Sequence, residues 1–174
     1  GIKEIVLSGI NIGDFGVENE NLYLLLLELE KINNLKRYRI SSIEPNLLNN
    51  NIINLLSKSK KALPHLHIPL QSGSNKILKD MKRRYSVNNY RALMNKLNQF
   101  IPNACIGVDV IVGFPTETHE DFMETYNFLD EMDISYLHVF SYSKRPNTEA
   151  AIMKSIPTSN EISIRRKKLQ KLSN

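Results

Sequence analysis

Residues Ile106 to Gly113 read I-G-V-D-V-I-V-G, an apolar run as long as one buried β-strand. Ile or Val occupies every even position of this run, whereas the odd positions hold Gly107, Asp109, Ile111 and Gly113. A strand that is apolar on both faces is typical of a parallel sheet covered by helices. We therefore expect the Ile and Val side chains to pack on helices. The odd-numbered side chains should face the interior of a barrel, where the smaller residues leave room for a ligand.

The rest of the chain alternates strand-length apolar runs with longer segments of helical period. Such alternation predicts parallel strands joined by right-handed crossovers. The expected class is α/β, a partial (β/α) TIM-like barrel of about five parallel strands, in a single domain over residues 1–174. The predicted strands are Glu4–Ser8, Arg39–Ser42, His65–Pro69, Ile106–Gly113 and Tyr136–Tyr142. The predicted helices cover residues 22–32, 48–56, 74–81, 86–97, 118–129 and 158–169.

The composition of the 174 residues is that of an ordinary globular protein, with 41% hydrophobic and 24% charged residues. It excludes a disordered tail, a collagen-like chain and a coiled coil as the main body. One cysteine excludes a disulfide framework and a cysteine-built metal site within this chain, so we expect a reducing, cytoplasmic location. The net charge of +5 permits a nucleic-acid partner without requiring one. The basic run at 165–171 fits either a solvated helix face or an RNA contact.

Polar residues follow all five predicted strands, and ligands of parallel α/β barrels bind at this edge. Each segment taken alone is also ordinary turn chemistry. The pair Gln71-Ser72 fits a turn before a helix or a ligand contact, and Glu44 fits a loop charge or an acceptor for a ribose hydroxyl. Asp109 is costly to bury alone, so we expect a basic partner, with Arg84 as the first candidate.

The four histidines and the cysteine give no clear metal pattern. His65 and His67 alternate on one strand and share a face, but the sequence shows no third ligand. We interpret the histidines as packing residues and Cys105 as an inert core thiol.

Four ordered strings carry a resemblance to radical S-adenosylmethionine methylthiotransferases. They run from about Glu4 to Ala151 and are E-I-V-L-S-G-I-N (4–11), H-I-P-L-Q-S-G-S (67–74) with M-K-R-R-Y (81–85), D-V-I-V-G-F-P-T-E (109–117) and H-V-F-S-Y-S-K-R-P-N-T (138–148). The strings N-I-G-D-F-G (11–16) and R-I-S-S-I-E-P (39–45) most resemble the branch that acts on threonylcarbamoyladenosine in tRNA.

The resemblance implies a 4Fe–4S cluster, held by a CxxxCxxC loop, that reduces S-adenosylmethionine to a 5′-deoxyadenosyl radical. A second cluster serves in sulfur insertion, and the net reaction replaces a C–H of the modified adenine with a methylthio group. It further implies tRNA as partner, no membrane, and S-adenosylmethionine contacts at the strand ends. The residues expected to bind this cofactor are Gly9, Asn11, Ser42, Glu44, Gln71, Ser72, Arg84, Asp109, Ile111, Gly113 and Phe140.

The sequence departs from the family pattern in what it lacks. We expect a C-terminal portion of the barrel, without the first βα unit, the CxxxCxxC segment, the N-terminal cluster domain and the C-terminal RNA-binding domain. No catalytic residue and no metal ligand are assigned, and this portion alone should be inactive. Asn147 also stands where the family more often has Gly. The alternatives are another methylthiotransferase branch (isopentenyladenosine tRNA or ribosomal protein), an unrelated aldolase-like TIM barrel, and a non-enzymatic RNA-binding module.

Overall fold

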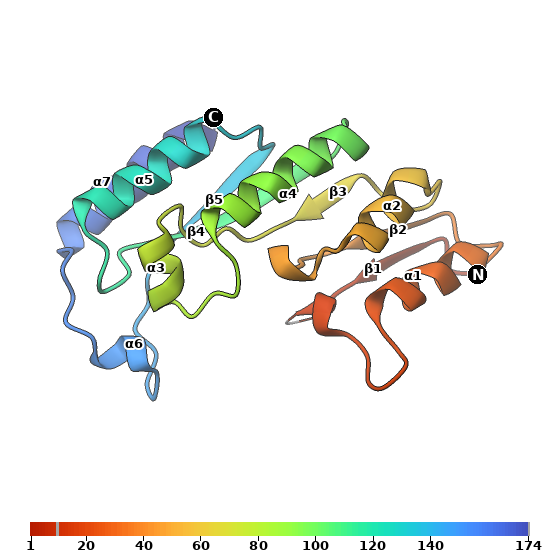
Figure 1. Cartoon of the computed structure of the whole chain (residues 1–174), viewed down its shortest axis with the longest axis horizontal. Coiled ribbons are helices and arrows are strands. Elements are labelled where there is room, and N and C mark those ends of the chain that lie inside the picture. Colours follow the sequence, from red (N-terminus) through yellow and green to blue (C-terminus); the bar gives the residue numbers. More distant parts are fainter. Residues whose placement is uncertain (10, 174) are drawn as a thin grey trace.

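The computed structural model describes residues 1–9 and 11–173, in which five strands alternate with helices (Figure 1). The motif residue Ile10 lies outside these ranges. The strands are β1 (Glu4–Leu7), β2 (Arg37–Ile40), β3 (His65–His67), β4 (Cys105–Val112) and β5 (Tyr136–Ser141). The α-helices are α1 (Leu22–Lys31), α2 (Asn50–Lys58), α3 (Asn75–Asp80), α4 (Val87–Phe100), α5 (His119–Asp130), α6 (Glu149–Ile152) and α7 (Ser159–Gln170). Short 3₁₀ turns are η1 (Ile12–Asp14), η2 (Pro45–Leu47) and η3 (Lys171–Ser173).

All strand pairs are parallel, as the alternation of elements predicts. β1 pairs with β2, and β3, β4 and β5 form a second sheet in that order. A parallel bridge between Tyr38 and Ala62 and a hydrogen bond from Ile43 N–H to the His67 carbonyl (3.1 Å) link the two sheets. The strands therefore follow one another in sequence order, and Figure 1 shows the chain progressing across the molecule from β1 and α1 to α7.

Three helices begin with the reciprocal hydrogen bonds of a capping box. The side chain of the N-cap residue accepts a hydrogen bond from the backbone N–H three residues on, and that residue's side chain accepts one from the backbone N–H of the cap. Ser86, Thr118 and Thr158 are the caps, and all three helix starts are confirmed. Among the helices in the described ranges, none is long and apolar enough to cross a membrane.

β4 has the two-sided character that its sequence predicts. Its even-numbered residues, from Ile106 to Val112, are at most 1% exposed and pack in the core with α4 and α5. Tyr90 of α4 is also buried, and its hydroxyl donates to the Ile68 carbonyl at 2.7 Å. Asp109 and Ile111, on the other side, are only partly buried. We call this side of the sheet the open face. Its residues are Asp109 and Ile111 of β4, His138 and Phe140 of β5, and His67 of β3.

The connection after β5 is less irregular than the sequence suggests, because it contains the four-residue helix α6. A single helical turn is too short to produce a detectable apolar period. Asn147, just before it, has a φ of 62°. This left-handed conformation favours Gly, and Asn is among the few other residues that tolerate it. The departure from the family's more common Gly therefore keeps the backbone that the position requires.

Candidate functional site

Three cavities lie where the strands end. The β4–β5 cavity has a volume of about 520 Å³, and its lining includes Gln71, Asp109, Ile111 and Phe140. The α3–α6 cavity, of about 410 Å³, shares Ile111 with it and extends to α6. The loop cavity, of about 240 Å³, is lined by Asn11, Asp14, Glu44, Met81, Lys82, Arg83 and Arg84. The volumes of the β4–β5 and α3–α6 cavities suit a small organic ligand, and the loop cavity is smaller.

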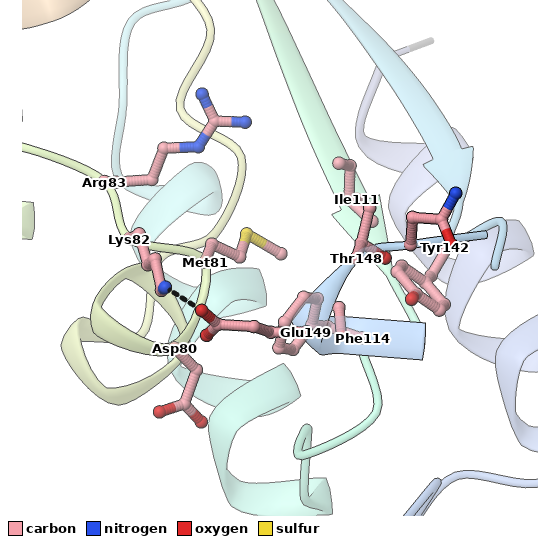
Figure 2. A pocket seen from close by; sticks show the side chains of 11 residues that line it. Asp80, Met81, Lys82, Arg83, Ile111, Phe114, Tyr142, Thr148 and Glu149 are labelled. Carbon is pink, nitrogen blue, oxygen red and sulfur yellow. Dashed lines mark hydrogen bonds and ion pairs between the residues drawn. The ribbon is translucent and has the colours of Figure 1, made fainter. Parts of the chain in front are cut away.

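The turn after α3 is shared by these cavities. Arg83 lines all three, and its guanidinium donates to Glu44 at 3.1 Å. Lys82, with a φ of 58°, pairs with Glu149 of α6 at 2.5 Å, so the ion pair connects this turn to the segment that follows β5 (Figure 2). Figure 2 also shows Ile111 and Phe114 of the β4 side near Tyr142.

The structure separates the predicted cofactor-binding residues into groups. Four line the β4–β5 cavity, and Asn11, Glu44 and Arg84 line the loop cavity. Ser72 is 1% exposed, and its hydroxyl is hydrogen-bonded to Thr125 on α5 (3.2 Å). Gly9, Ser42 and Gly113 line none of the three cavities.

The expected ion pair between Asp109 and Arg84 is wrong. Asp109 Oδ1 instead lies 2.8 Å from His67 Nε2 and 3.3 Å from His138 Nδ1. Arg84 is exposed in the turn after α3, and it lines the loop cavity with Glu44. Parallel pairing places β3 and β5 on either side of β4 at Asp109. His67 and His138 on these strands therefore contact the carboxylate, whereas Arg84 lies in a loop outside the sheet.

The sequence predicts space for a ligand beside the small residues of β4. At Gly107, towards the beginning of the strand, the ring of Tyr136 fills that space. A Cβ on Gly107 would lie 2.0 Å from Tyr136 Cζ, so the absence of a side chain allows the ring to cross β4. The Tyr136 hydroxyl reaches His65 Nε2 at 3.1 Å. Burial and the nearby charge of Arg39 lower the pKa of His65. Cys105, at the start of β4, is exposed, so its interpretation as a core thiol is wrong.

A buried ion pair holds the turn after β4. The Glu117 carboxylate accepts the Gly113 N–H at 2.6 Å and an Arg165 guanidinium N–H at 2.8 Å. Gly113 has a φ of 80°, and Ile162 of α7 covers it so closely that a Cβ would lie 2.5 Å from Ile162 Cγ1. Burial raises the pKa of Glu117, although both hydrogen bonds oppose the shift. Helix α7 thus fixes the turn that follows Ile111.

Sequence reasoning missed two residues that carry unsatisfied polar atoms. Arg83 Nε and the Tyr142 hydroxyl are buried and have no hydrogen-bond partner, and both residues line the β4–β5 and α3–α6 cavities. Buried polar atoms are usually paired with protein or water, so these two atoms are available to a water or to a polar ligand in the cavities. Both residues belong to strings that the sequence analysis quotes, but only the tertiary structure distinguishes Arg83 from Arg84.

Polar cavities at the carboxyl ends of parallel strands are where α/β proteins bind their ligands. The family model of the radical SAM superfamily matches residues 1–129. The chain therefore belongs to the radical SAM superfamily, whose members use S-adenosylmethionine and a 4Fe–4S cluster. This membership overturns the alternative of an unrelated aldolase-like barrel.

Several relatives of this chain are tRNA methylthiotransferases. The chain is 49% identical over 156 residues to the threonylcarbamoyladenosine tRNA methylthiotransferase MtaB of Bacillus subtilis, covering 88% of this chain and 35% of the relative. It is 44% identical to MtaB of Aquifex aeolicus, with 88% and 38% covered. It is 40% identical to the tRNA-2-methylthio-N(6)-dimethylallyladenosine synthase of Endomicrobium trichonymphae, with 88% and 37% covered. The chain thus spans little more than a third of these relatives.

Solved structures support the fold. The archaeal Elp3 of Methanocaldococcus infernus superposes with a TM-score of 0.65 at 16% identity, covering 93% of this chain and 43% of that one. The radical SAM enzyme coproporphyrinogen III oxidase (HemN) of Escherichia coli gives 0.54 at 16% identity, with 97% and 50% covered.

Proposed function

We propose that the chain is part of the catalytic barrel of a tRNA methylthiotransferase acting on threonylcarbamoyladenosine beside the anticodon. The observation that carries the proposal is the convergence of strand-end residues on the β4–β5 cavity, in a chain 44–49% identical to two relatives named for that activity. The five strands would be one part of a (β/α) TIM-like barrel. Its first βα unit, cluster domain and RNA-binding domain would come from other segments of a longer cytoplasmic protein, since the chain spans little more than a third of these relatives.

The β4–β5 cavity has the chemistry to hold S-adenosylmethionine. Ile111 and the 52%-exposed Phe140 offer apolar surface for a flat purine, while Gln71 and Asp109 offer polar atoms for hydroxyl and amino groups. The unsatisfied Tyr142 hydroxyl adds another polar contact. We therefore assign cofactor binding to this cavity.

The chain's residues do not fit a 4Fe–4S cluster. Such clusters take cysteine thiolates as ligands, and the sequence has one cysteine, which is exposed at the start of β4. The strands end, and the cavities lie, at the other end of this sheet. We therefore assign no cluster ligand and no step of cluster chemistry to these residues.

Binding of S-adenosylhomocysteine to the 174-residue chain, measured by calorimetry, tests the cavity. Phe140→Ala should weaken binding by about tenfold or more, because loss of a buried aromatic contact is worth about 1.5–3 kcal/mol. Phe100→Ala removes another exposed phenylalanine, at the end of α4, and should leave affinity within about twofold. Equal affinities of the two variants, or no binding by the wild type, would reject the cavity assignment.

The substrate is tested by mass spectrometry of tRNA nucleosides after deletion of the gene that encodes this chain. The methylthio group should disappear from threonylcarbamoyladenosine and remain on isopentenyladenosine. The second candidate is the isopentenyladenosine branch, which the 40% identity to the dimethylallyladenosine synthase favours. Loss of the group from isopentenyladenosine alone would establish that branch instead.

A further inference from the structure

We propose that His67, Asp109 and His138 bind one divalent transition-metal ion, for which Zn²⁺ is the fitting probe, on the open face of β3, β4 and β5. Ligand atoms of the three side chains lie within 4.8 Å of one another. The site shares Asp109 with the cavity assigned to cofactor binding, but it contains no thiolate of an iron–sulfur cluster, and the inference does not depend on the proposed function.

The Asp109 carboxylate has the spacing from each histidine nitrogen that a shared metal ion needs. Zinc binds imidazole nitrogen and carboxylate oxygen at about 2.0–2.2 Å, so neighbouring ligand atoms sit about 2.9–3.4 Å apart at ordinary coordination angles. Asp109 Oδ1 lies 2.8 Å from His67 Nε2 and 3.3 Å from His138 Nδ1. The two histidine nitrogens lie within 4.8 Å of each other, so rotation of the imidazoles would bring all three atoms to one ion.

Hydrogen-bonded strands hold the three ligands in place. His138 is paired in register with Asp109, and His67 is paired with Gly107, two residues earlier on β4. Packing of the Tyr136 ring against both imidazoles, with centroids 6.2 Å from His67 and 5.1 Å from His138, further restricts their rotation. A site on adjacent strands loses little conformational entropy when it binds a metal ion.

The donor set indicates which ion fits. Two imidazoles and one carboxylate favour zinc, iron and other first-row metals over magnesium and calcium, which prefer oxygen. With neutral histidines the site carries one negative charge, which attracts a cation. The side chains of His67 and Asp109 are 20% exposed and that of His138 is 53% exposed, so an ion can enter. Asp109 also lines the β4–β5 cavity, which leaves space for a water or a ligand to complete the coordination.

Metal binding and the hydrogen bonds of the free protein require different histidine tautomers. To donate to Asp109, His67 must carry its proton on Nε2 and His138 on Nδ1. To bind a metal ion, the same nitrogens must present lone pairs, so each proton leaves or moves to the other ring nitrogen. The tautomer of each ring therefore reports directly whether the metal is bound at these atoms.

The test uses the 174-residue chain purified without a histidine tag. Titration with Zn²⁺ in a calorimeter should show one saturable site, and Co²⁺ should give the visible bands of a low-coordinate complex. Nitrogen-15 NMR should show that His67 Nε2 and His138 Nδ1 lose their protons on metal binding. Loss of a group that only orients a metal ligand weakens metal binding by about 10–100-fold. His67→Ala and His138→Gln each remove a proposed ligand, so each should weaken Zn²⁺ binding by more than about 100-fold.

His119→Ala is the matched control, because this histidine is exposed at the start of α5. The Zn²⁺ affinity of this variant should equal that of the wild type. Half-exposed His138 can be replaced without disturbing the core, so its variant remains informative if His67→Ala unfolds. Absence of saturable binding, equal affinity of His138→Gln and His119→Ala, or unchanged tautomers at one equivalent of metal would overturn the site. The three residues would then be only a hydrogen-bonded cluster.

Discussion

Replacing Arg165 with Met tests whether α7 supports the turn after β4 through a buried charge. The substitution keeps an apolar stem beside Phe122 but leaves the Glu117 carboxylate, 2% exposed, with the Gly113 N–H and no cation. Removing one partner of a buried ion pair costs about 3–5 kcal/mol. Protonation limits this cost, because neutralising a carboxyl of ordinary pKa 4.5 at pH 7 requires about 3.4 kcal/mol. We therefore expect a loss of about 3 kcal/mol of unfolding free energy at pH 7.

The pH dependence gives the sign of the effect. A carboxyl whose pKa is raised in the folded state destabilises that state, and the cost grows as pH rises above the pKa of the carboxyl in the unfolded state. The pKa of Glu117 should be raised further when Arg165 is absent. The difference in stability between Arg165→Met and the wild type should therefore shrink between pH 7 and pH 5. Adding Glu117→Gln, which has no charge to compensate, should recover part of the stability and remove the pH dependence of this difference.

Urea unfolding followed by circular dichroism at the two pH values measures these differences. Arg166→Met is the control, since this neighbour on α7 is exposed and should change stability by less than about 0.5 kcal/mol. If Arg165→Met behaves like this control, or if its deficit is the same at pH 7 and pH 5, Arg165 does not compensate a buried charge at Glu117.

Three further substitutions test local features by the same unfolding assay. Gly107→Ala should cost about 1–3 kcal/mol by overpacking against Tyr136, and the cost should fall in a Tyr136→Ala background; an equal cost in both would reject the contact. Gly113→Ala should cost about 1–2 kcal/mol from its φ alone, so Ile162→Ala should rescue it only in part; full rescue would contradict the strain argument. Burial opposes the charged form of Asp121, but hydrogen bonds from Lys76, Thr118 and Ser74 outweigh burial and lower the pKa of Asp121. The Asp121 carboxylate therefore stabilises the fold above the pKa it has in the unfolded state, and this contribution is lost as pH falls below about 4. Asp121→Asn should reduce the acid sensitivity of unfolding; an unchanged acid profile would refute this.

Local patterns in the sequence were sufficient to predict the five strands, every described α-helix except α6, and their order. Apolar runs and capping residues such as Ser86 and Thr118 act over a few neighbours, so they can be read without tertiary contacts. The five parallel strands follow, with ends displaced by at most two residues, because strict alternation leaves few topologies. The two-sided pattern of Ile106–Gly113 likewise predicted which face of β4 is buried.

What the sequence could not determine is which polar side chains meet. Asp109 lies beside His67 and His138 because strand register and side-chain length set that contact, whereas a long-range charge argument selected Arg84. The choice of Arg83 over its neighbour depends on a left-handed turn at Lys82, and no local pattern predicts that conformation. Sequence alone determined the α/β class and the order of the parallel strands, since both depend on local periodicity, and the parallel order predicts a site at the carboxyl ends of the strands. The tertiary structure decided the site's contacts, because those depend on a few ångströms between segments far apart in the chain.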